Sequence, residues 1–161
     1  MSAAEIKARL GELAMETPPD LRIRGGDVLD LVRRRWVRLT PEEWVRQHVI
    51  GWLRDRIGVP TALMAVEREV IVGGMKRRVD VLVRDRAGAV WMVVEVKAAA
   101  VPVGQPVADQ VGWYDSALKA RFVLVTNGHE VRGWERDENG NFRIMSGLPY
   151  FRSNDPVETR V

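Results

Sequence analysis

The stretch that decides the fold lies near the middle of the chain and reads Val90-Trp91-Met92-Val93-Val94-Glu95-Val96-Lys97. Its nearly continuous run of apolar residues predicts a strand that is buried on both faces. Glu95 and Lys97 are two positions apart, so their side chains are expected on the same face of this strand. The strand therefore ends with a carboxylate and an ammonium group side by side.

Two further strands precede this segment and form a meander with it. Residues 66–72 alternate between apolar and charged side chains, and Gly73-Gly74 permits a tight turn into a second strand at 75–84. The turn at 85–88 reverses the chain again. Asp80 lies within the second strand, where a buried carboxylate is unfavourable unless something compensates its charge.

Helices are expected on either side of the meander. Thr40-Pro41-Glu42-Glu43 provides a capping threonine, a proline at the first helical position and a glutamate that closes a capping box, and the helix is expected to run to about Ile57. Residues 106–120 predict a second helix, and residues 122–126 predict another buried strand. The order α-β-β-β-α-β predicts an α/β fold with a mixed central sheet flanked by helices.

The N-terminal part of the chain is expected to add helices to this core. Residues 4–15 place apolar side chains on one helical face and predict a helical arm within residues 1–26. Asp27 is positioned to cap a short helix through Val32. The basic run Arg33-Arg34-Arg35 that follows faces either phosphate or solvent, and we favour solvent.

A single domain is expected to span residues 27–147. Residues 131–136 predict an edge strand within it, and residues 148–161 predict a loosely held tail.

Composition limits the classes of function. With 161 residues and 46% hydrophobic content the chain can bury a core of its own. It has no cysteine and two histidines, which excludes disulfides and argues against a zinc site, so a catalytic metal would need oxygen ligands. We expect a cytoplasmic protein without a membrane segment, because no apolar stretch approaches the required length. The net charge of +3 favours nucleic acid as a partner but also fits an ordinary solvated surface.

The acids of the two neighbouring strands indicate metal chemistry. A magnesium ion bridging Asp80 and Glu95, with the backbone carbonyl of Val96 as a further ligand, would compensate both charges and activate water. Lys97 would orient or deprotonate that water. Two structural alternatives remain open: Glu95 and Lys97 form an ion-pair surface at a sheet edge, or Asp80 pairs with Arg77 or Arg78.

Several motifs occur in a fixed order along most of the chain. They are Leu39-Thr40-Pro41-Glu42-Glu43-Trp44-Val45-Arg46-Gln47, Arg77-Arg78-Val79-Asp80-Val81-Leu82-Val83, Val93-Val94-Glu95-Val96-Lys97-Ala98, Gln110-Val111-Gly112-Trp113-Tyr114 and Val125-Thr126-Asn127-Gly128. This series resembles the N-terminal nuclease domain of type I restriction enzyme R subunits, within the PD-(D/E)XK superfamily. The resemblance implies the αβββαβ restriction-endonuclease-like core and magnesium-dependent cleavage of DNA, with manganese as a substitute.

The resemblance also assigns roles to further residues. Gln110 and Tyr114 match the family's Q-x-x-x-Y element, although Gln110 also reads as an exposed helical residue and Tyr114 as a core residue. Glu43 matches an acid on the first core helix, with helix capping as the alternative. Arg46, Arg78 and Tyr114 are candidate substrate contacts, and Arg46 could instead neutralise the acids. Ala98 to Ala100 replaces the proline that relatives carry after the lysine, which affects the shape of the loop.

The leading hypothesis is an endodeoxyribonuclease in restriction, defence or DNA processing. The chain lacks a phosphate-binding G-x-x-x-x-G-K-[ST] loop, so no ATP is expected, and its partners would be DNA and a second copy or a larger complex that supplies target choice. The alternative is a module that keeps the nuclease fold and binds DNA or protein with little or no turnover.

Overall fold

The computed structural model describes residues 17–103, 113–114, 118–145, 147 and 149–152 of the chain. The predicted N-terminal helical arm, Gln110 and most of the predicted helix at 106–120 lie outside these residues. Trp113, Tyr114 and Leu118, which belong to that predicted helix, are helical. None of the helices in the described part is long and apolar enough to cross a membrane.

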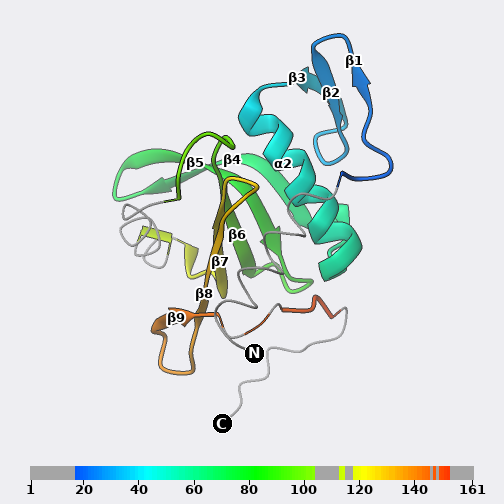
Figure 1. Ribbon diagram of the computed structural model, residues 1–161. Coiled ribbons are helices and arrows are strands. Elements are labelled where there is room, and N and C mark those ends of the chain that lie inside the picture. Colours follow the sequence, from blue (N-terminus) through cyan, green and yellow to red (C-terminus); the bar gives the residue numbers. More distant parts are fainter. Residues whose placement is uncertain (1–16, 104–112, 115–117, 146, 148, 153–161) are drawn as a thin grey trace.

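A central sheet of six strands has the order β4-β5-β6-β7-β8-β9 and organises the molecule (Figure 1). Its strands are β4 (Met64–Val72), β5 (Met75–Arg84), β6 (Val90–Val96), β7 (Phe122–Thr126), β8 (Val131–Arg136) and β9 (Phe142–Ile144). Neighbouring strands are antiparallel except β6 and β7, which are parallel. The mixed α/β class and the predicted three-stranded meander are therefore confirmed. The strand predicted as an edge, β8, is covered on its outer side by β9.

The first helix begins and ends where its capping residues predict. Thr40 accepts a hydrogen bond from the backbone N–H of Glu43 at 3.0 Å, and α2 (Pro41–Trp52) continues into a π-helical turn, Leu53–Ile57. Gly58, with φ of 85°, ends this turn in the left-handed conformation that glycine adopts without strain. The reciprocal half of the capping box is absent, because the N–H of Thr40 donates to the carbonyl of Arg38.

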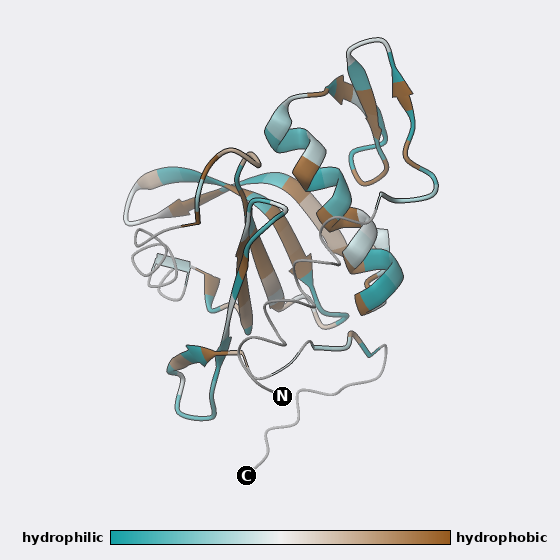
Figure 2. Cartoon of the chain, viewed as in Figure 1, coloured by the Kyte–Doolittle hydropathy of each residue, from teal (hydrophilic) through white to brown (hydrophobic). Residues whose placement is uncertain are grey.

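Two cores lie on opposite faces of the sheet. On the face toward α2, apolar side chains of the helical segment pack on the central strands. Among them are Val49 and Leu53, which belong to the same core as Val81 and Val94. The opposite core packs Tyr114 with Leu82 and Val93. Figure 2 shows the hydrophobic colour concentrated along these central strands. The alternation of strand side chains between two cores explains why β6 is apolar throughout.

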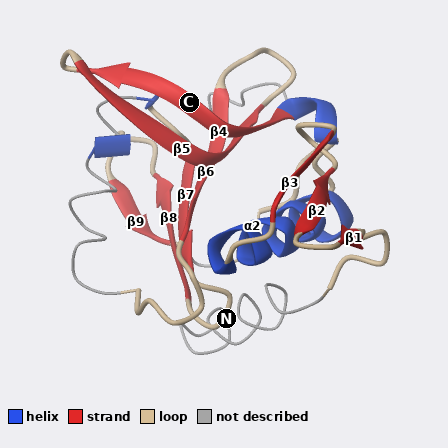
Figure 3. Ribbon diagram, turned by 90° about the horizontal axis from the view of Figure 1, so that it is seen from above, coloured by secondary structure: helices blue, strands red, loops and turns tan. Residues whose placement is uncertain are grey.

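The segment predicted as a short helix after Asp27 is instead a small antiparallel sheet. It has the order β1-β2-β3, with β1 (Ile23–Arg24), β2 (Asp27–Asp30) and β3 (Arg35–Arg38). Figures 1 and 3 show α2 between this small sheet and the central sheet. The prediction failed because β2 and β3 pair as a hairpin across the turn at 31–34, and this cross-strand pairing outweighs the short helical pattern.

The segment predicted as a loosely held tail packs on the domain where the structure describes it. The N–H of Phe151 donates to the carbonyl of Ile57 at 2.9 Å, and its ring meets Trp91 edge to face at 5.1 Å between centroids. One aromatic anchor therefore ties residues beyond Gly147 to the π-helical turn and the core.

Candidate active site

The pairing of β4 with β5 is interrupted at Asp80. Val66 pairs with Val81 and Arg68 pairs with Val79, which leaves Glu67 and Asp80 facing each other without a pairing of their own. Glu67 has φ of 52°, a left-handed conformation that is strained for a residue with a side chain. Val79 packs in one core and Val81 in the other, so β5 loses its regular alternation at Asp80. The backbone is therefore irregular where the predicted site lies.

Asp80 is held between the strand β6 and the helix α2. Its Oδ2 accepts the backbone N–H of Val96 at 2.8 Å, and its Oδ1 accepts Nη2 of Arg46 at 3.0 Å. Burial raises the pKa of Asp80 above its usual range, and nearby Glu95 raises it further, against the lowering effect of these two hydrogen bonds. Asp80 thus forms its ion pair with Arg46, and not with Arg77 or Arg78, which were the alternative partners suggested by the sequence.

Glu95 binds the predicted lysine and the predicted tyrosine. Lys97 Nζ lies 3.0 Å from Glu95 Oε1, and the hydroxyl of Tyr114 donates to Glu95 Oε2. Tyr114 is also part of the core, which was the alternative to its role as a site residue. Burial and the charge of Glu95 raise the pKa of Tyr114, which keeps the hydroxyl protonated as a donor. Because β6 lies in the middle of the sheet, the pair of Glu95 with Lys97 is not an edge feature.

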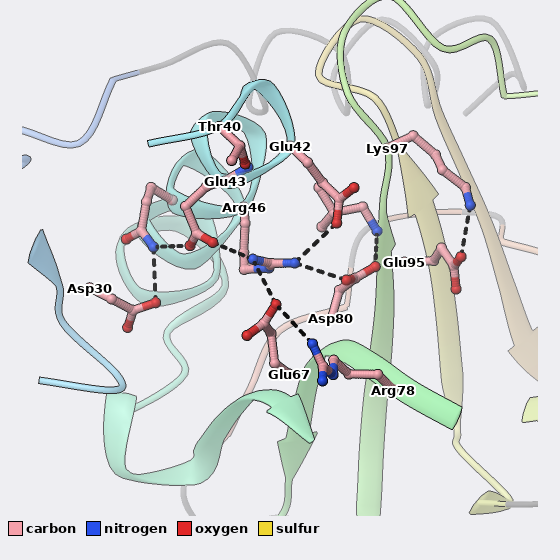
Figure 4. A network of polar contacts seen from close by, with 12 residues as sticks. Asp30, Thr40, Glu42, Glu43, Arg46, Glu67, Arg78, Asp80, Glu95 and Lys97 are labelled. Atoms are coloured by element: carbon pink, nitrogen blue, oxygen red, sulfur yellow. Dashed lines mark hydrogen bonds and ion pairs between the residues drawn. The ribbon is translucent and has the colours of Figure 1, made fainter. Parts of the chain in front are cut away.

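Arg46 joins the helix to both sides of the site. Its side chain is 3% exposed, and besides Asp80 it bonds Glu43 and lies 3.2 Å from Glu42 Oε1 and 3.7 Å from Glu67 Oε1. Burial works against its charge, but Glu43 and Asp80 raise the pKa of Arg46 above its usual value. Figure 4 shows the guanidinium surrounded by Glu43, Glu67 and Asp80. In this arrangement Arg46 neutralises acids, which was one of its two expected roles.

Glu43 is a hub of buried hydrogen bonds. Its carboxylate accepts from Arg46 and Arg33 and from Gln47 Nε2 at 2.9 Å. Arg33 and Gln47 also donate to Asp30 Oδ2, at 2.8 Å and 3.0 Å. The prediction that the basic run Arg33-Arg34-Arg35 faces solvent is therefore wrong for Arg33. It is confirmed for Arg34 and Arg35, which are exposed. The backbone of Glu43 takes part in the helix cap, and its side chain supports the site indirectly through Arg46.

Asp30, Arg33, Gln47 and Glu67 belong to this network, yet the sequence analysis assigned none of them to the site. Gln47 is one helical turn after Glu43, and that spacing is the signal that could have identified it. The other three reach the site through strand pairing, which leaves no local pattern.

A shallow pocket opens beside Glu95 on the face of Tyr114. Arg77, Arg78 and Trp113 complete its lining, and the guanidinium of Arg77 lies over the Trp113 ring at 4.9 Å. Arg78 is exposed and lies 3.8 Å from Glu67 Oε1. The candidate substrate contact Arg78 therefore borders an accessible site.

The predicted residues thus fall into two groups that meet at the end of β6. One group holds Asp80 with Arg46 and Glu43, and the other holds Glu95 with Lys97 and Tyr114. The N–H of Val96, between Glu95 and Lys97, connects them through Asp80. Within the described parts of the chain, no three histidine, cysteine, aspartate or glutamate residues are grouped as metal ligands.

Comparisons with known proteins identify the family to which the chain belongs. A model of the type I restriction enzyme R protein N terminus matches residues 41–149. A solved fragment from Vibrio vulnificus YJ016, described as a candidate HsdR subunit of a type I restriction enzyme, is similar with 24% sequence identity and a TM-score of 0.41. The match covers 54% of this chain and 19% of that one, so the chain spans a small part of that protein. No curated protein matches significantly. Because the family model covers more than half of the sequence, the chain belongs to the family of type I restriction enzyme R protein N-terminal domains.

Proposed function

We propose that this chain is a metal-dependent endodeoxyribonuclease with a PD-(D/E)XK-type core, in which Asp80, Glu95 and Lys97 carry the reaction. Membership of a restriction enzyme family supports a role in restriction or nucleic-acid cleavage. The magnesium requirement, the DNA substrate and the roles of single residues are part of the proposal. A second copy or other subunits would supply target choice.

One observation carries the proposal. The pairing of Val81 with Val94 sets Asp80 opposite Glu95 at the next position of the ladder, and regular pairing stops there. The strained Glu67 faces the same point from β4. Irregular backbone and a buried acid with a raised pKa gather at functional sites more often than elsewhere.

The donor set suits magnesium by its chemistry. Asp80 and Glu95 offer carboxylate oxygens, and the carbonyl of Val96 directly follows Glu95 in sequence, which makes a set of hard oxygen ligands. Arg46 and Lys97 now provide the positive charge next to these acids. A cation that binds both acids would have to replace at least one of these ion pairs.

The chain's own residues have distinct tasks in this scheme. Magnesium, or manganese in its place, supplies Lewis-acid activation of water and charge neutralisation at the phosphate when bound. Lys97 orients the attacking water through its ammonium group, or would accept the water's proton at Nζ in the neutral amine form, and Glu95 fixes the position of that nitrogen. Tyr114 fixes the second oxygen of Glu95. Arg46 and Glu43 position Asp80, and Gln110 remains a proposed contact for water or phosphate.

Plasmid nicking with magnesium or manganese tests the proposal. Asp80→Asn, Glu95→Gln and Lys97→Ala should each abolish nicking, whereas Glu138→Gln and Lys76→Ala, at exposed positions, should cut like the wild type. A rise in melting temperature with added manganese, present in the wild type and lost in Asp80→Asn, would report metal binding without relying on activity. Equal nicking by all the variants would show that a contaminant cuts and would refute the proposal.

A second candidate function is a DNA- or protein-binding module with little or no turnover. It is favoured by the ion pairs that already neutralise Asp80 and Glu95 through Arg46 and Lys97. This alternative predicts DNA binding without nicking and no effect of manganese on the melting temperature.

A further inference from the structure

The small sheet presents one face that is rich in arginine. Arg24 pairs with Asp27, which pairs with Arg38, so these three residues share a face. The N–H of Leu29 donates to the carbonyl of Arg22, and Leu29 pairs with Trp36, which places this second row on the same face. The outer face of the small sheet therefore contains Arg22, Arg24, Asp27, Leu29, Trp36 and Arg38. Its three arginines are exposed, and Asp27 is its one acid.

Two of the arginine side chains have defined positions. The guanidinium of Arg24 lies over the ring of Trp36 at 4.3 Å, which leaves its donors directed around the edge of an aromatic surface. The guanidinium of Arg38 lies across the turn at Gly26, where an added Cβ would come within 2.8 Å of its Nη1. One guanidinium thus covers the aromatic ring, and a second lies against the turn at Gly26.

The opposite face of the small sheet is tied to the candidate site. Val28 and Asp30 are fully buried there. Asp30 connects through Arg33 to Glu43, and Glu43 connects through Arg46 to Asp80. This chain of buried hydrogen bonds fixes the orientation of the outer face relative to the two strand acids.

We propose that the outer face of the small sheet binds the phosphate backbone of DNA. Three arginines against one aspartate make this surface complementary to a polyanion, and guanidinium groups match phosphate oxygens with two parallel hydrogen bonds. All residues of this face precede residue 41, where the family match begins, so the face lies outside the region that the family model describes. This inference rests on the proposed function for its choice of DNA as the partner.

Binding of duplex DNA to the full chain, measured without divalent cations over a range of salt concentrations, tests the inference. The triple variant Arg22→Ala, Arg24→Ala, Arg38→Ala should bind roughly 10- to 100-fold more weakly at low salt. Its plot of log affinity against log salt should be shallower by about two to three, because each lost phosphate contact removes nearly one unit of slope. The control Arg86→Ala, Arg132→Ala, Arg143→Ala removes the same charge from exposed positions elsewhere and should retain most of the affinity.

Further variants separate this inference from the proposed function. Arg22→Lys, Arg24→Lys, Arg38→Lys keeps the charge and should restore most of the slope even if the alanine variant folds poorly. Asp80→Asn should lose nicking and keep the affinity of the wild type. Equal affinity of the alanine variant and the wild type, an equal loss in the control, or a wild type that does not bind duplex DNA would each overturn the inference. Binding through this face without any nicking would overturn the nuclease proposal alone.

Discussion

Asp30 and Asp80 are two acids at opposite ends of one network, and they differ in how completely the protein satisfies them. Asp30 is fully buried and accepts from the N–H groups of Val32 and Arg33 and from the side chains of Arg33 and Gln47. Asp80 is 16% exposed and accepts from Val96 and Arg46. Burial acts to raise both pKa values, but the donors around Asp30 outweigh it and the pKa falls, whereas that of Asp80 stays raised.

On this difference we propose that Asp30 is a structural acid and Asp80 a functional one. A carboxylate with four donors is stable as an anion without any ligand, because its hydrogen bonds replace those it made with water. A partly satisfied carboxylate at an irregular strand pair keeps capacity for another cation. Exposure alone would not reveal this, since both acids lie in the same buried region.

Cleavage should distinguish the two acids most strongly. Asp80→Asn is expected to lower the nicking rate by on the order of 100-fold or more, because it removes a proposed ligand of the activating ion. Asp30→Asn should retain nicking when assayed well below its melting temperature. Rates measured on supercoiled plasmid test the contrast, and similar losses in the two variants would place both acids in the same role.

Stability should depend more on Asp30 than on Asp80. Asp30→Ala is expected to lower the free energy of unfolding by about 3 kcal/mol, because it leaves two backbone N–H groups and Gln47 without their acceptor. This corresponds to a fall of roughly 10 °C in melting temperature. Asp27→Ala, in the same strand but partly exposed, serves as a control and should shift stability by less than about 0.5 kcal/mol.

The stabilisation by Asp30 should also depend on pH. Its folded pKa lies below the ordinary value of 3.8, so the charged form stabilises the fold above about that pH and the contribution is lost as pH falls further. The difference in unfolding free energy between the wild type and Asp30→Asn should stay constant from neutral pH to about 5 and shrink below about 4. Urea titrations at several pH values measure it, and a difference that vanishes near neutral pH would contradict the assignment.

Removing the hydroxyl that holds Glu95 should have a smaller effect. Tyr114→Phe is expected to lower the free energy of unfolding by about 1.5 kcal/mol, the low end for a hydrogen bond to a charged group, because Glu95 keeps another donor. The core packing of the ring is retained. Thermal melts give the change, with Tyr150→Phe at an exposed position as the control.

Asp80→Asn should have the smallest effect on stability and should not be destabilising. The folded pKa of Asp80 is raised, so its charged form costs stability at neutral pH, and that cost is absent where the carboxyl is protonated. The variant is therefore expected to match the wild type or gain up to about 1 kcal/mol at pH 7, as is common when a functional residue is neutralised. A loss as large as that of Asp30→Ala would remove the distinction between the two acids.

Local sequence predicted those parts of the molecule whose signals are local. Thr40 and Gly58 mark the ends of the first helical segment through capping and backbone freedom, and the structure confirms both. The apolar run before Glu95 predicted a central strand because a strand buried on both faces has no polar alternation. The spacing of Glu95 and Lys97 likewise predicted two groups that lie together.

Only the tertiary structure decided which partners the acids have. Arg46 reaches Asp80 across 34 positions of sequence and Arg33 reaches Glu67 across another 34, so no periodic pattern records either pair. The small sheet replaced a predicted helix because pairing with β3 satisfied the backbone of β2. Sequence alone thus determined the elements and the chemical groups that they carry, whereas long-range packing determined which acid is saturated by donors and which one accepts fewer.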